Sequence, residues 1–146
     1  MTLTGAPEVV QVAEECVEAL NASDWERLRA TFAADAVWDE VGTQRRVQGV
    51  SAVIELSRGW RAAFPDARGT VTNAVAAGDT AVMELAYEGT HDGPMETPQG
   101  GIPPSGKKVT VRAVMVAQVR DGRITEVREY FDVLTLLTQI GAAPQG

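Results

Sequence analysis

The stretch from Val109 to Phe131 constrains the fold most, because apolar and polar residues alternate through much of it. Between Val109 and Val119 every odd-numbered position is apolar, whereas the even-numbered positions include most of the polar residues. A period of two is typical of a β-strand with one buried face. A second strand-like segment follows Asp121-Gly122, a pair of residues that favours hairpin turns. The pattern therefore predicts an antiparallel hairpin whose odd-numbered first-strand residues face the interior.

The turn decides which residues of the second strand face inward, because a slip of one residue exchanges the two faces. A two-residue turn at Asp121-Gly122 would pair Val119 with Ile124 and would direct mostly charged residues inward. A three-residue turn over 120–122, with a left-handed glycine at its end, would pair Val119 with Arg123. The inward residues would then be Thr125, Val127, Glu129 and Phe131. This second register buries far less charge, and we predict it.

Glu129 is then the one ionisable residue on an otherwise apolar face, where it lies opposite Ala113 and near Met115 and Phe131. An isolated buried charge is costly, so its carboxyl group must be paired, be protonated or face a cavity. Burial would also raise its pKa, as a general acid or base that works near neutral pH requires. The alternative is an ordinary glutamate at the solvent edge of the strand. We predict a cavity with Glu129 as the catalytic acid or base.

Tyr87 and His91 fall on the inward side of the segment 80–92, whose odd-numbered positions are largely apolar. His91 is the only histidine, which excludes a metal site built from several histidines, and we expect no metal. Both residues are predicted to contribute to catalysis. The simpler alternatives are a histidine with satisfied hydrogen bonds at the rim and a core tyrosine with one hydrogen bond.

Three helices and five strands account for most of the chain. The expected helices are 7–21, a short one capped by Ser23 with Glu26 as its capping-box partner, and 50–64; a closing turn of helix is expected in addition at 133–140. The expected strands are 36–41, 68–77, 80–92, 108–119 and 123–131, with a polar turn at 42–49. This order predicts an α+β fold in which a curved antiparallel sheet wraps around three N-terminal helices. We expect a single domain over 1–146, with an ordered core from 7 to 141.

Aromatic residues on the other elements are predicted to complete the pocket wall. Trp38 and Glu40 share one face of the strand 36–41, and Trp60 lies on the apolar side of the helix 50–64. With Ala113, Met115 and Phe131 they form the predicted substrate-binding set. The opposite sheet face would carry Arg112, Val114, Val116, Arg128 and Tyr130. Such a partly apolar face is usually covered, so we expect a homodimer that forms through it.

Composition narrows the possible partners. The formal net charge of −7 argues against nucleic acids and anionic membrane surfaces, which select basic patches. Cys16 is the only cysteine, no secretory signal is visible, and no segment approaches the roughly 20 apolar residues that a spanning helix needs. We therefore expect a cytoplasmic protein, and the pocket predicted above would bind a small hydrophobic substrate.

Four segments together carry a family likeness. They are GTHDG at 89–93, GIPPSGKKV at 101–109, DGRITE at 121–126 and YFDVLTLLTQIG at 130–141. With the helix–helix–strand–helix opening they resemble the SnoaL-like polyketide cyclases, a branch of the nuclear transport factor 2-like and ketosteroid-isomerase-like superfamily. The resemblance implies a cone-shaped α+β barrel, usually a homodimer, with a hydrophobic pocket between the helices and the sheet.

The resemblance also implies a reaction. The named cyclases close a ring of an aromatic polyketide by intramolecular aldol condensation without a metal or an organic cofactor. Their catalytic aspartate in the last strand falls at the position of Glu129, and the histidine of GTHDG matches His91. Their supporting glutamine and histidine fall at Ala113 and Met115, which is a departure from the family pattern. An aldol condensation or a cycloaddition in a shaped pocket would both suit this set.

Other members of the superfamily remain alternatives. A ketosteroid isomerase needs a tyrosine and two carboxylates, which Tyr87, Glu129 and Glu40 match loosely. An epoxide hydrolase of the limonene type needs an inward Asp-Arg-Asp set, but no arginine lies on the predicted inward face. A scytalone-dehydratase-type site needs two histidines. A non-catalytic small-molecule-binding dimer also remains open. The cofactor-independent cyclase is the prediction.

Overall fold

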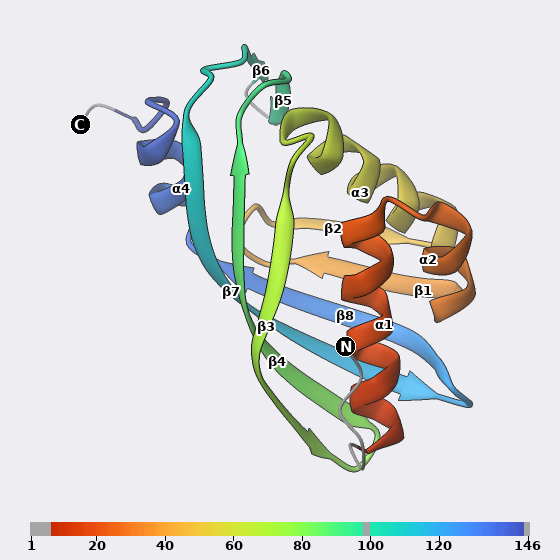
Figure 1. The fold of residues 1–146 in the computed structure, drawn as a ribbon. Helices are drawn as coiled ribbons and strands as arrows, with labels where there is room; N and C mark the ends of the chain where they lie inside the picture. Colours follow the sequence, from red (N-terminus) through yellow and green to blue (C-terminus); the bar gives the residue numbers. More distant parts are fainter. Residues whose placement is uncertain (1–6, 98–99, 145–146) are drawn as a thin grey trace.

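The computed structural model describes residues 7–97 and 100–144, which form three helices packed against a six-stranded sheet (Figure 1). The helices on the sheet are α1 (Glu8–Ala22), α2 (Trp25–Thr31) and α3 (Val50–Ala63). The strands are β1 (Phe32–Glu40), β2 (Arg45–Gln48), β3 (Arg68–Ala77), β4 (Thr80–Thr90), β7 (Lys108–Arg120) and β8 (Arg123–Phe131). A short helix, α4 (Val133–Gln139), follows β8. The expected α+β fold is confirmed.

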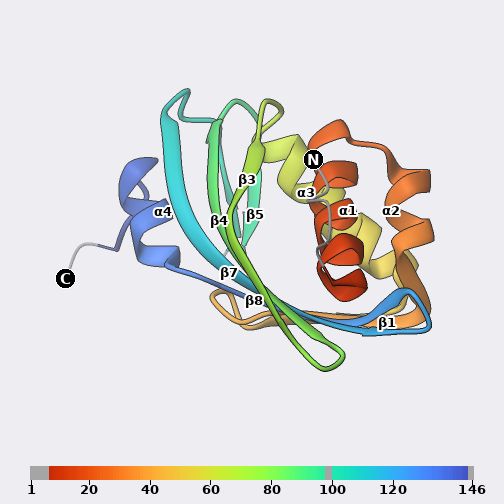
Figure 2. The same cartoon turned by 60° about the horizontal axis from the view of Figure 1, so that its bottom comes forward.

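The sheet curves around the helices but does not close. Its strand order is β2-β1-β8-β7-β4-β3, and every neighbouring pair is antiparallel except β1 with β8. Figure 2 shows α1, α2 and α3 on the concave side and α4 beyond β7. Because β2 and β3 remain free edges, the expected barrel is an open, strongly curved sheet.

The β7–β8 hairpin has a different turn from the predicted one. Asp121 and Gly122 both have positive φ, 52° and 76°, and Arg120 pairs with Arg123, so the turn has two residues. Val119 accordingly pairs with Ile124, and the predicted three-residue turn is wrong. Ile124, and not Arg123, is therefore the residue opposite Val119; it faces inward and is fully buried.

A β-bulge one step further along β8 restores the predicted faces. The pairing jumps from Val119–Ile124 to Gln118–Glu126, so β8 has one extra residue at Thr125. An extra residue shifts the side-chain alternation by one. Glu129 therefore faces inward as predicted, although its partner across the ladder is Met115 and not Ala113.

The first two helices meet at a different cap from the predicted one. Ser23 has a left-handed conformation (φ 52°) and ends α1, whereas Asp24 precedes α2 and accepts a hydrogen bond from the backbone N–H of Arg27 at 3.1 Å. Aspartate is as good an N-cap as serine, so the short loop supports either choice locally. The predicted capping box from Ser23 to Glu26 is wrong by one residue.

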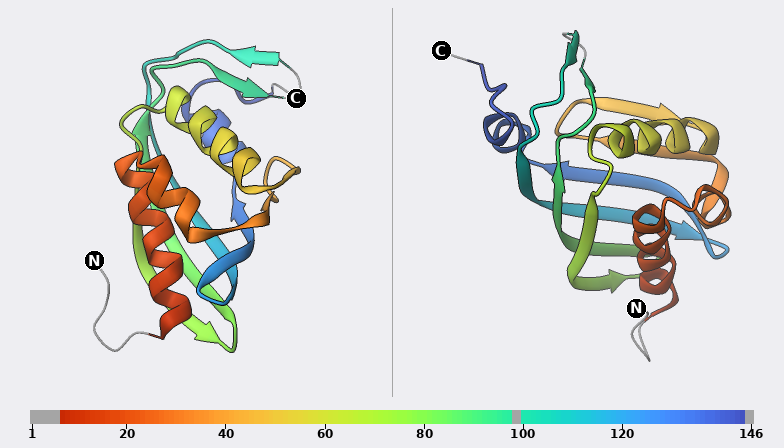
Figure 3. Two further views of the ribbon diagram at one scale, coloured as in Figure 1. Left: turned by 90° about the vertical axis from the view of Figure 1, so that its right-hand side faces the viewer. Right: turned by 45° about the horizontal axis from the view of Figure 1, so that its top comes forward.

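Three short strands lie in segments predicted as turn or loop. β2 follows a tight turn after β1 and pairs with it, from Glu40–Arg45 to Val37–Gln48. β5 (Met95–Thr97) and β6 (Gly100–Ile102) form a separate hairpin beside α3 (Figure 3). Each strand has only three or four residues, so alternation could not distinguish it from a loop.

The core follows the predicted inward faces. The odd-numbered residues of β7 are all buried, as are Ala81, Met83 and Leu85 of β4. They pack against the apolar sides of α1 and α3, while Phe64, Met95 and Leu136 gather in a second cluster at the other end.

Among the described residues, no helix is long and apolar enough to cross a membrane.

Candidate active site

A cavity of 160 Å³ lies between the helices and the concave face of the sheet. Its walls come from all four helices, from β1, β3, β4, β7 and β8 and from the loop before β3, and they are mostly apolar. The lining residues are Leu20, Asn21, Trp25, Trp38, Ser57, Trp60, Arg61, Phe64, Ala67, Arg68, Gly69, Tyr87, Glu88, Gly89, Val109, Val111, Glu129, Phe131 and Leu136. The predicted residues Trp38, Trp60, Tyr87, Glu129 and Phe131 therefore do come together.

Two glutamates line this cavity, Glu88 and Glu129; Glu88 is exposed, whereas only 7% of Glu129 is exposed. Burial, followed by the negative charge of Glu40, raises its pKa from 4.5 to about 7, and the hydrogen bond from Tyr87 acts in the opposite direction. A group with this pKa is present in both protonation states at neutral pH. Glu129 can therefore accept or donate a proton there, as general acid–base catalysis requires.

Tyr87 donates a hydrogen bond from its hydroxyl to Glu129 Oε2 at 2.9 Å. Burial and the nearby carboxylate raise the pKa of Tyr87 well above its usual range, so its hydroxyl keeps its proton. Gly69, its partner on β3, leaves room for the ring, because a Cβ at this position would lie 2.7 Å from Tyr87 Cε1. The tyrosine thus orients one oxygen of Glu129 and leaves the other free.

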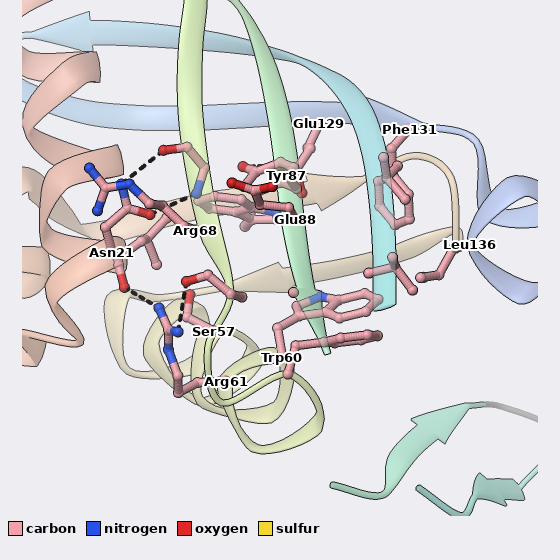
Figure 4. Close-up of a pocket in the computed structure, with 18 of the residues that line it drawn as sticks. Asn21, Ser57, Trp60, Arg61, Arg68, Tyr87, Glu88, Glu129, Phe131 and Leu136 are labelled. Atoms are coloured by element: carbon pink, nitrogen blue, oxygen red, sulfur yellow. Dashed lines mark hydrogen bonds between the residues drawn. The ribbon is translucent and has the colours of Figure 1, made fainter. Parts of the chain in front are cut away.

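The cavity has two chemically different ends on either side of the Glu129–Tyr87 pair (Figure 4). At one end Trp60 packs edge-on against Phe131, with ring centroids 5.9 Å apart, and Leu136 lies beside them. At the other end lie polar side chains: Asn21, Ser57, Arg61 and Arg68. A bound molecule would therefore meet apolar rings at one end and hydrogen-bonding groups at the other.

Hydrogen bonds hold the polar end in shape. Arg61 donates to the backbone carbonyls of Pro65, Ala67 and Leu20 at 3.0, 2.8 and 2.7 Å, which ties α3 to α1 and to the loop before β3. Asn21 makes two bonds with the backbone of Gly69, at 2.8 and 2.9 Å. These contacts connect the C-terminal ends of two helices to the start of β3 and so fix the rim.

Glu40 is buried immediately behind the wall and is not among the lining residues, although it was predicted as a substrate contact. It is the Cα partner of Glu129 across the parallel β1–β8 pair. Its carboxylate accepts hydrogen bonds from Trp60 Nε1 at 2.7 Å and from Arg45 Nη2 at 2.9 Å. An arginine therefore does reach the inward side, contrary to the sequence-based expectation, because it comes from the unpredicted strand β2.

A family model for SnoaL-like polyketide cyclases matches residues 9–140 of the chain. The chain belongs to the SnoaL-like polyketide cyclase family. The match includes every strand of the main sheet and nearly all of α1. No curated protein sequence gives a significant match.

Solved structures of similar proteins agree with this assignment. A protein from Jannaschia sp. CCS1, described as a candidate SnoaL-like polyketide cyclase, is 26% identical, with a TM-score of 0.83 and 94% of each chain covered. IdmH from Streptomyces antibioticus, described as a candidate polyketide cyclase, is 29% identical, with a TM-score of 0.78 over 92% of this chain and 99% of that one. An epoxide hydrolase of the LEH-like type from M. tuberculosis shares the fold at 23% identity, with a TM-score of 0.71 over 91% and 89% of the two chains.

Three positions taken from the family resemblance lie outside the cavity lining. Ala113 and Met115 are buried on β7 but do not line it. His91 is also fully buried, at the end of β4, where its ring packs against Phe64 with centroids 5.3 Å apart. The structure therefore groups Glu129 with Tyr87 and separates both from His91.

Residues that the sequence reasoning missed make up much of the remaining lining. Phe64, Val109, Val111 and Leu136 extend the apolar end, and Asn21, Ser57, Arg61 and Arg68 form the polar end. Val109 and Val111 lie on the predicted inward face of the strand 108–119, so the pattern had marked them as interior. Asn21, Arg61 and Arg68 lie near the ends of helices or strands, where periodicity carries no signal, whereas Ser57 lies in the middle of α3.

Proposed function

We propose that this protein is a cofactor-independent cyclase that acts on a hydrophobic polyketide-type intermediate. The observation that carries the proposal is Glu129, a carboxyl group with a pKa of about 7 inside a largely apolar cavity. The family is one of polyketide cyclases, and proton transfer is the chemistry that such a carboxyl group supplies. This favours an aldol condensation over a cycloaddition, which needs no acid or base.

The proposed reaction uses Glu129 twice. As a carboxylate it removes a proton from a carbon next to a ketone, and the resulting enolate carbon attacks a second carbonyl carbon of the same chain. The new C–C bond closes the ring, and the oxygen of the attacked carbonyl takes the proton back from Glu129. Tyr87 holds the glutamate in one orientation throughout. The cavity walls keep the two reacting carbons close together, which accounts for much of the rate gain in such reactions.

The walls also suggest how the substrate lies. Its apolar part would pack under Trp60, Phe131 and Leu136, while its oxygen-bearing part would point towards Asn21 and Arg68. Glu129 lies between the two ends, so the reacting carbons would be in the middle of the chain. A polyketide-type molecule with alternating ketones fits this distribution of polar and apolar groups.

A second function is an isomerase or dehydratase on the same scaffold. The observation that favours it is the direct hydrogen bond between Tyr87 and Glu129, because a tyrosine beside a carboxyl group can also assist proton transfer between two carbons of one substrate. A ring-containing enone would be the substrate in this case, and the product would keep the same carbon skeleton.

The deciding experiment supplies a linear poly-β-ketone, made in situ by a minimal polyketide synthase, and measures ring formation by liquid chromatography and mass spectrometry. We expect Glu129→Gln to lower the rate of ring closure about 100-fold or more. Glu55→Gln, an exposed glutamate on α3, is the matched control. Unchanged cyclisation in Glu129→Gln would leave only a shape-based template. Tight binding with no product from the wild-type protein would point to a ligand-binding role.

We also propose that the protein forms a homodimer through the outer sheet face. Val114, Val116 and Tyr130 share this face with Arg112 and Arg128, and Tyr130 is 44% exposed. A partly apolar surface of this kind favours association. Light scattering of Val116→Glu beside the wild type tests the interface, since a charge in its centre should shift the mass from dimer to monomer. A monomeric wild type would contradict the proposal.

A further inference from the structure

Glu40 is a fully buried carboxylate at the end of β1 that the proposed reaction does not use. It lies directly beside the catalytic strand, because Glu40 and Glu129 are Cα partners and the N–H of Val41 donates to the carbonyl of Glu129 at 2.9 Å. It does not line the cavity. A substrate held there would therefore reach Glu129 but not Glu40.

Both oxygens of Glu40 are occupied. Oε1 accepts hydrogen bonds from Arg45 Nη2 at 2.9 Å, from Arg45 Nε at 3.2 Å and from the hydroxyl of Thr43, while Oε2 accepts from Trp60 Nε1 at 2.7 Å. These donors come from β2, from the turn before it and from α3. A buried carboxylate needs such partners, and an ion pair with arginine is the strongest of them. The cluster is thus built around one fixed negative charge.

This cluster fixes one wall of the cavity. The bond to Glu40 leaves the indole of Trp60 a single orientation, in which its ring stacks with Phe64 at 6.1 Å and meets Phe131 edge-on at 5.9 Å. The guanidinium of Arg45 lies 5.8 Å from the centre of the same ring, on the way to Glu40. Without Glu40, the indole N–H would lose its partner and the ring could rotate.

The same charge also acts on Glu129. The ionisable groups that face Glu129 are Glu40 from β1, Tyr87 from β4 and Cys16 from α1. The residue across from it on β7 is Met115, which carries no charge. Arg61 from α3, Arg68 from β3 and Glu88 from β4 line the same cavity, and Arg45 is paired with Glu40. The Glu40 carboxylate is therefore the charged neighbour that opposes ionisation of Glu129, and its effect adds to that of burial.

We propose that Glu40 is a positioning residue for the Glu129 acid/base: its clamped carboxylate fixes the Trp60 wall and holds a negative charge beside Glu129. It acts through these two residues and does not touch the substrate. This inference rests on the proposed role of Glu129 in proton transfer. It adds that the two carboxylates have separate tasks, and that the second one sets the pH at which the first one works.

The test is a titration that needs no substrate. Protein labelled with δ-¹³C glutamate is followed by NMR from pH 4 to 9, and the Glu129 signal is assigned from its loss in Glu129→Gln. In Glu40→Gln we expect the midpoint of Glu129 to fall by about one pH unit, because the neighbouring charge is gone. Glu40→Asp keeps the charge and should keep the midpoint close to that of the wild type. An unmoved midpoint in Glu40→Gln overturns the proposal.

Asp39→Asn is the matched control, since it removes a negative charge from the adjacent residue, whose side chain lies on the opposite face of β1. We expect its Glu129 midpoint to stay within about 0.2 pH units of the wild type. An equal fall in Asp39→Asn and Glu40→Gln would mean that general surface charge sets the midpoint, which contradicts a specific role for Glu40.

Turnover separates this inference from the proposed function. The pH–rate profile of Glu40→Gln should shift in the same direction as the NMR midpoint, and its KM should rise because Trp60 is no longer fixed. If Glu129→Gln keeps full activity while Glu40→Gln still shifts the Glu129 midpoint, the cyclase mechanism fails and the coupling between the carboxylates holds. If Glu129→Gln is inactive and the midpoint does not move, only the role of Glu40 fails.

Discussion

Glu129 and His91 look alike in the sequence, because each is a polar residue on the inward face of an otherwise apolar strand, but the structure surrounds them differently. Glu129 lies in a cavity, and among the described residues its carboxyl group has one hydrogen-bond partner, Tyr87. His91 is fully enclosed: its Nδ1 accepts a hydrogen bond from the backbone N–H of Ser105 at 3.2 Å, and Phe64 covers its ring. Facing inward is therefore a different property from facing a cavity.

The two environments shift the pKa values of Glu129 and His91 in opposite directions, which fits separate tasks. Burial raises the pKa of Glu129 to about 7, where it can exchange protons, and burial lowers the pKa of His91, which favours the neutral ring. A neutral ring that accepts at Nδ1 from Ser105 holds the segment before β7 against the end of β4. The environment of Glu129 suits the proposed proton transfer, and that of His91 suits a role in holding these segments together.

His91→Ala should give the largest change in stability. It removes a buried ring and leaves the N–H of Ser105 without its acceptor, so we expect the free energy of unfolding to fall by about 3 kcal/mol. Urea denaturation measures this change. At a temperature where the variant is still folded, ring closure should stay within about threefold of the wild-type rate. A loss of turnover as large as that in Glu129→Gln would place His91 in the reaction and remove the contrast.

The pH dependence of stability should have opposite slopes for the two residues. Because the pKa of Glu129 is raised from 4.5 to about 7, its contribution is complete below about 4.5 and is lost as the pH rises through 7, a change of about 3 kcal/mol. His91 has a lowered pKa, so its contribution is present above about 6.5 and is lost as the pH falls through the lower folded value. Denaturation curves of the wild type and Glu129→Gln between pH 4.5 and 8 test the first slope. Parallel curves would contradict it.

Gly93→Ala tests how tightly the His91 segment is packed. Gly93 donates to the carbonyl of Ala63 at 3.1 Å, and a Cβ on it would lie 1.8 Å from the carbonyl oxygen of Ala62, which is part of α3. The backbone would have to move, so we expect a loss of about 2 kcal/mol. Gly59→Ala is the matched control, because nothing lies within 4 Å of its Cβ and alanine favours the helix interior. It should raise stability by about 0.5 to 1 kcal/mol. Equal effects would contradict the close packing.

Much of the fold could be predicted because long elements show their periodicity. β7 alternates over thirteen residues, and α1 and α3 each cover about four turns, so their faces were correctly assigned. β2, β5 and β6 have three or four residues and no detectable period. The helix cap was one residue off because Ser23 and Asp24 are equally good caps.

The site was predicted in part, and for a reason that is only half correct. The inward orientation of the Glu129 side chain was predicted from a three-residue turn. In the structure, a two-residue turn and a bulge at Thr125 together produce this orientation. Two wrong steps cancelled, because each shifts the alternation by one residue. With either turn, the face of β8 that carries fewer charged residues was the one expected to face inward. The positions of Arg45 and of most polar residues in the cavity depend on how the ends of strands and helices pack together. No local sequence pattern predicts this packing.

Tyr87→Phe should have the smallest effect of these variants, and it tests how the surroundings of Glu129 set its protonation. The variant keeps the ring and removes only the hydroxyl that donates to Glu129 Oε2. Because this hydrogen bond lowers the pKa of Glu129, its loss should move the titration midpoint upwards, so less carboxylate is present at pH 7. We expect kcat at pH 7 to fall about 10-fold, with part of the loss recovered at pH 8 to 9. Stopped assays over this pH range measure both effects. A profile identical to that of the wild type would mean that the tyrosine is only part of the cavity wall.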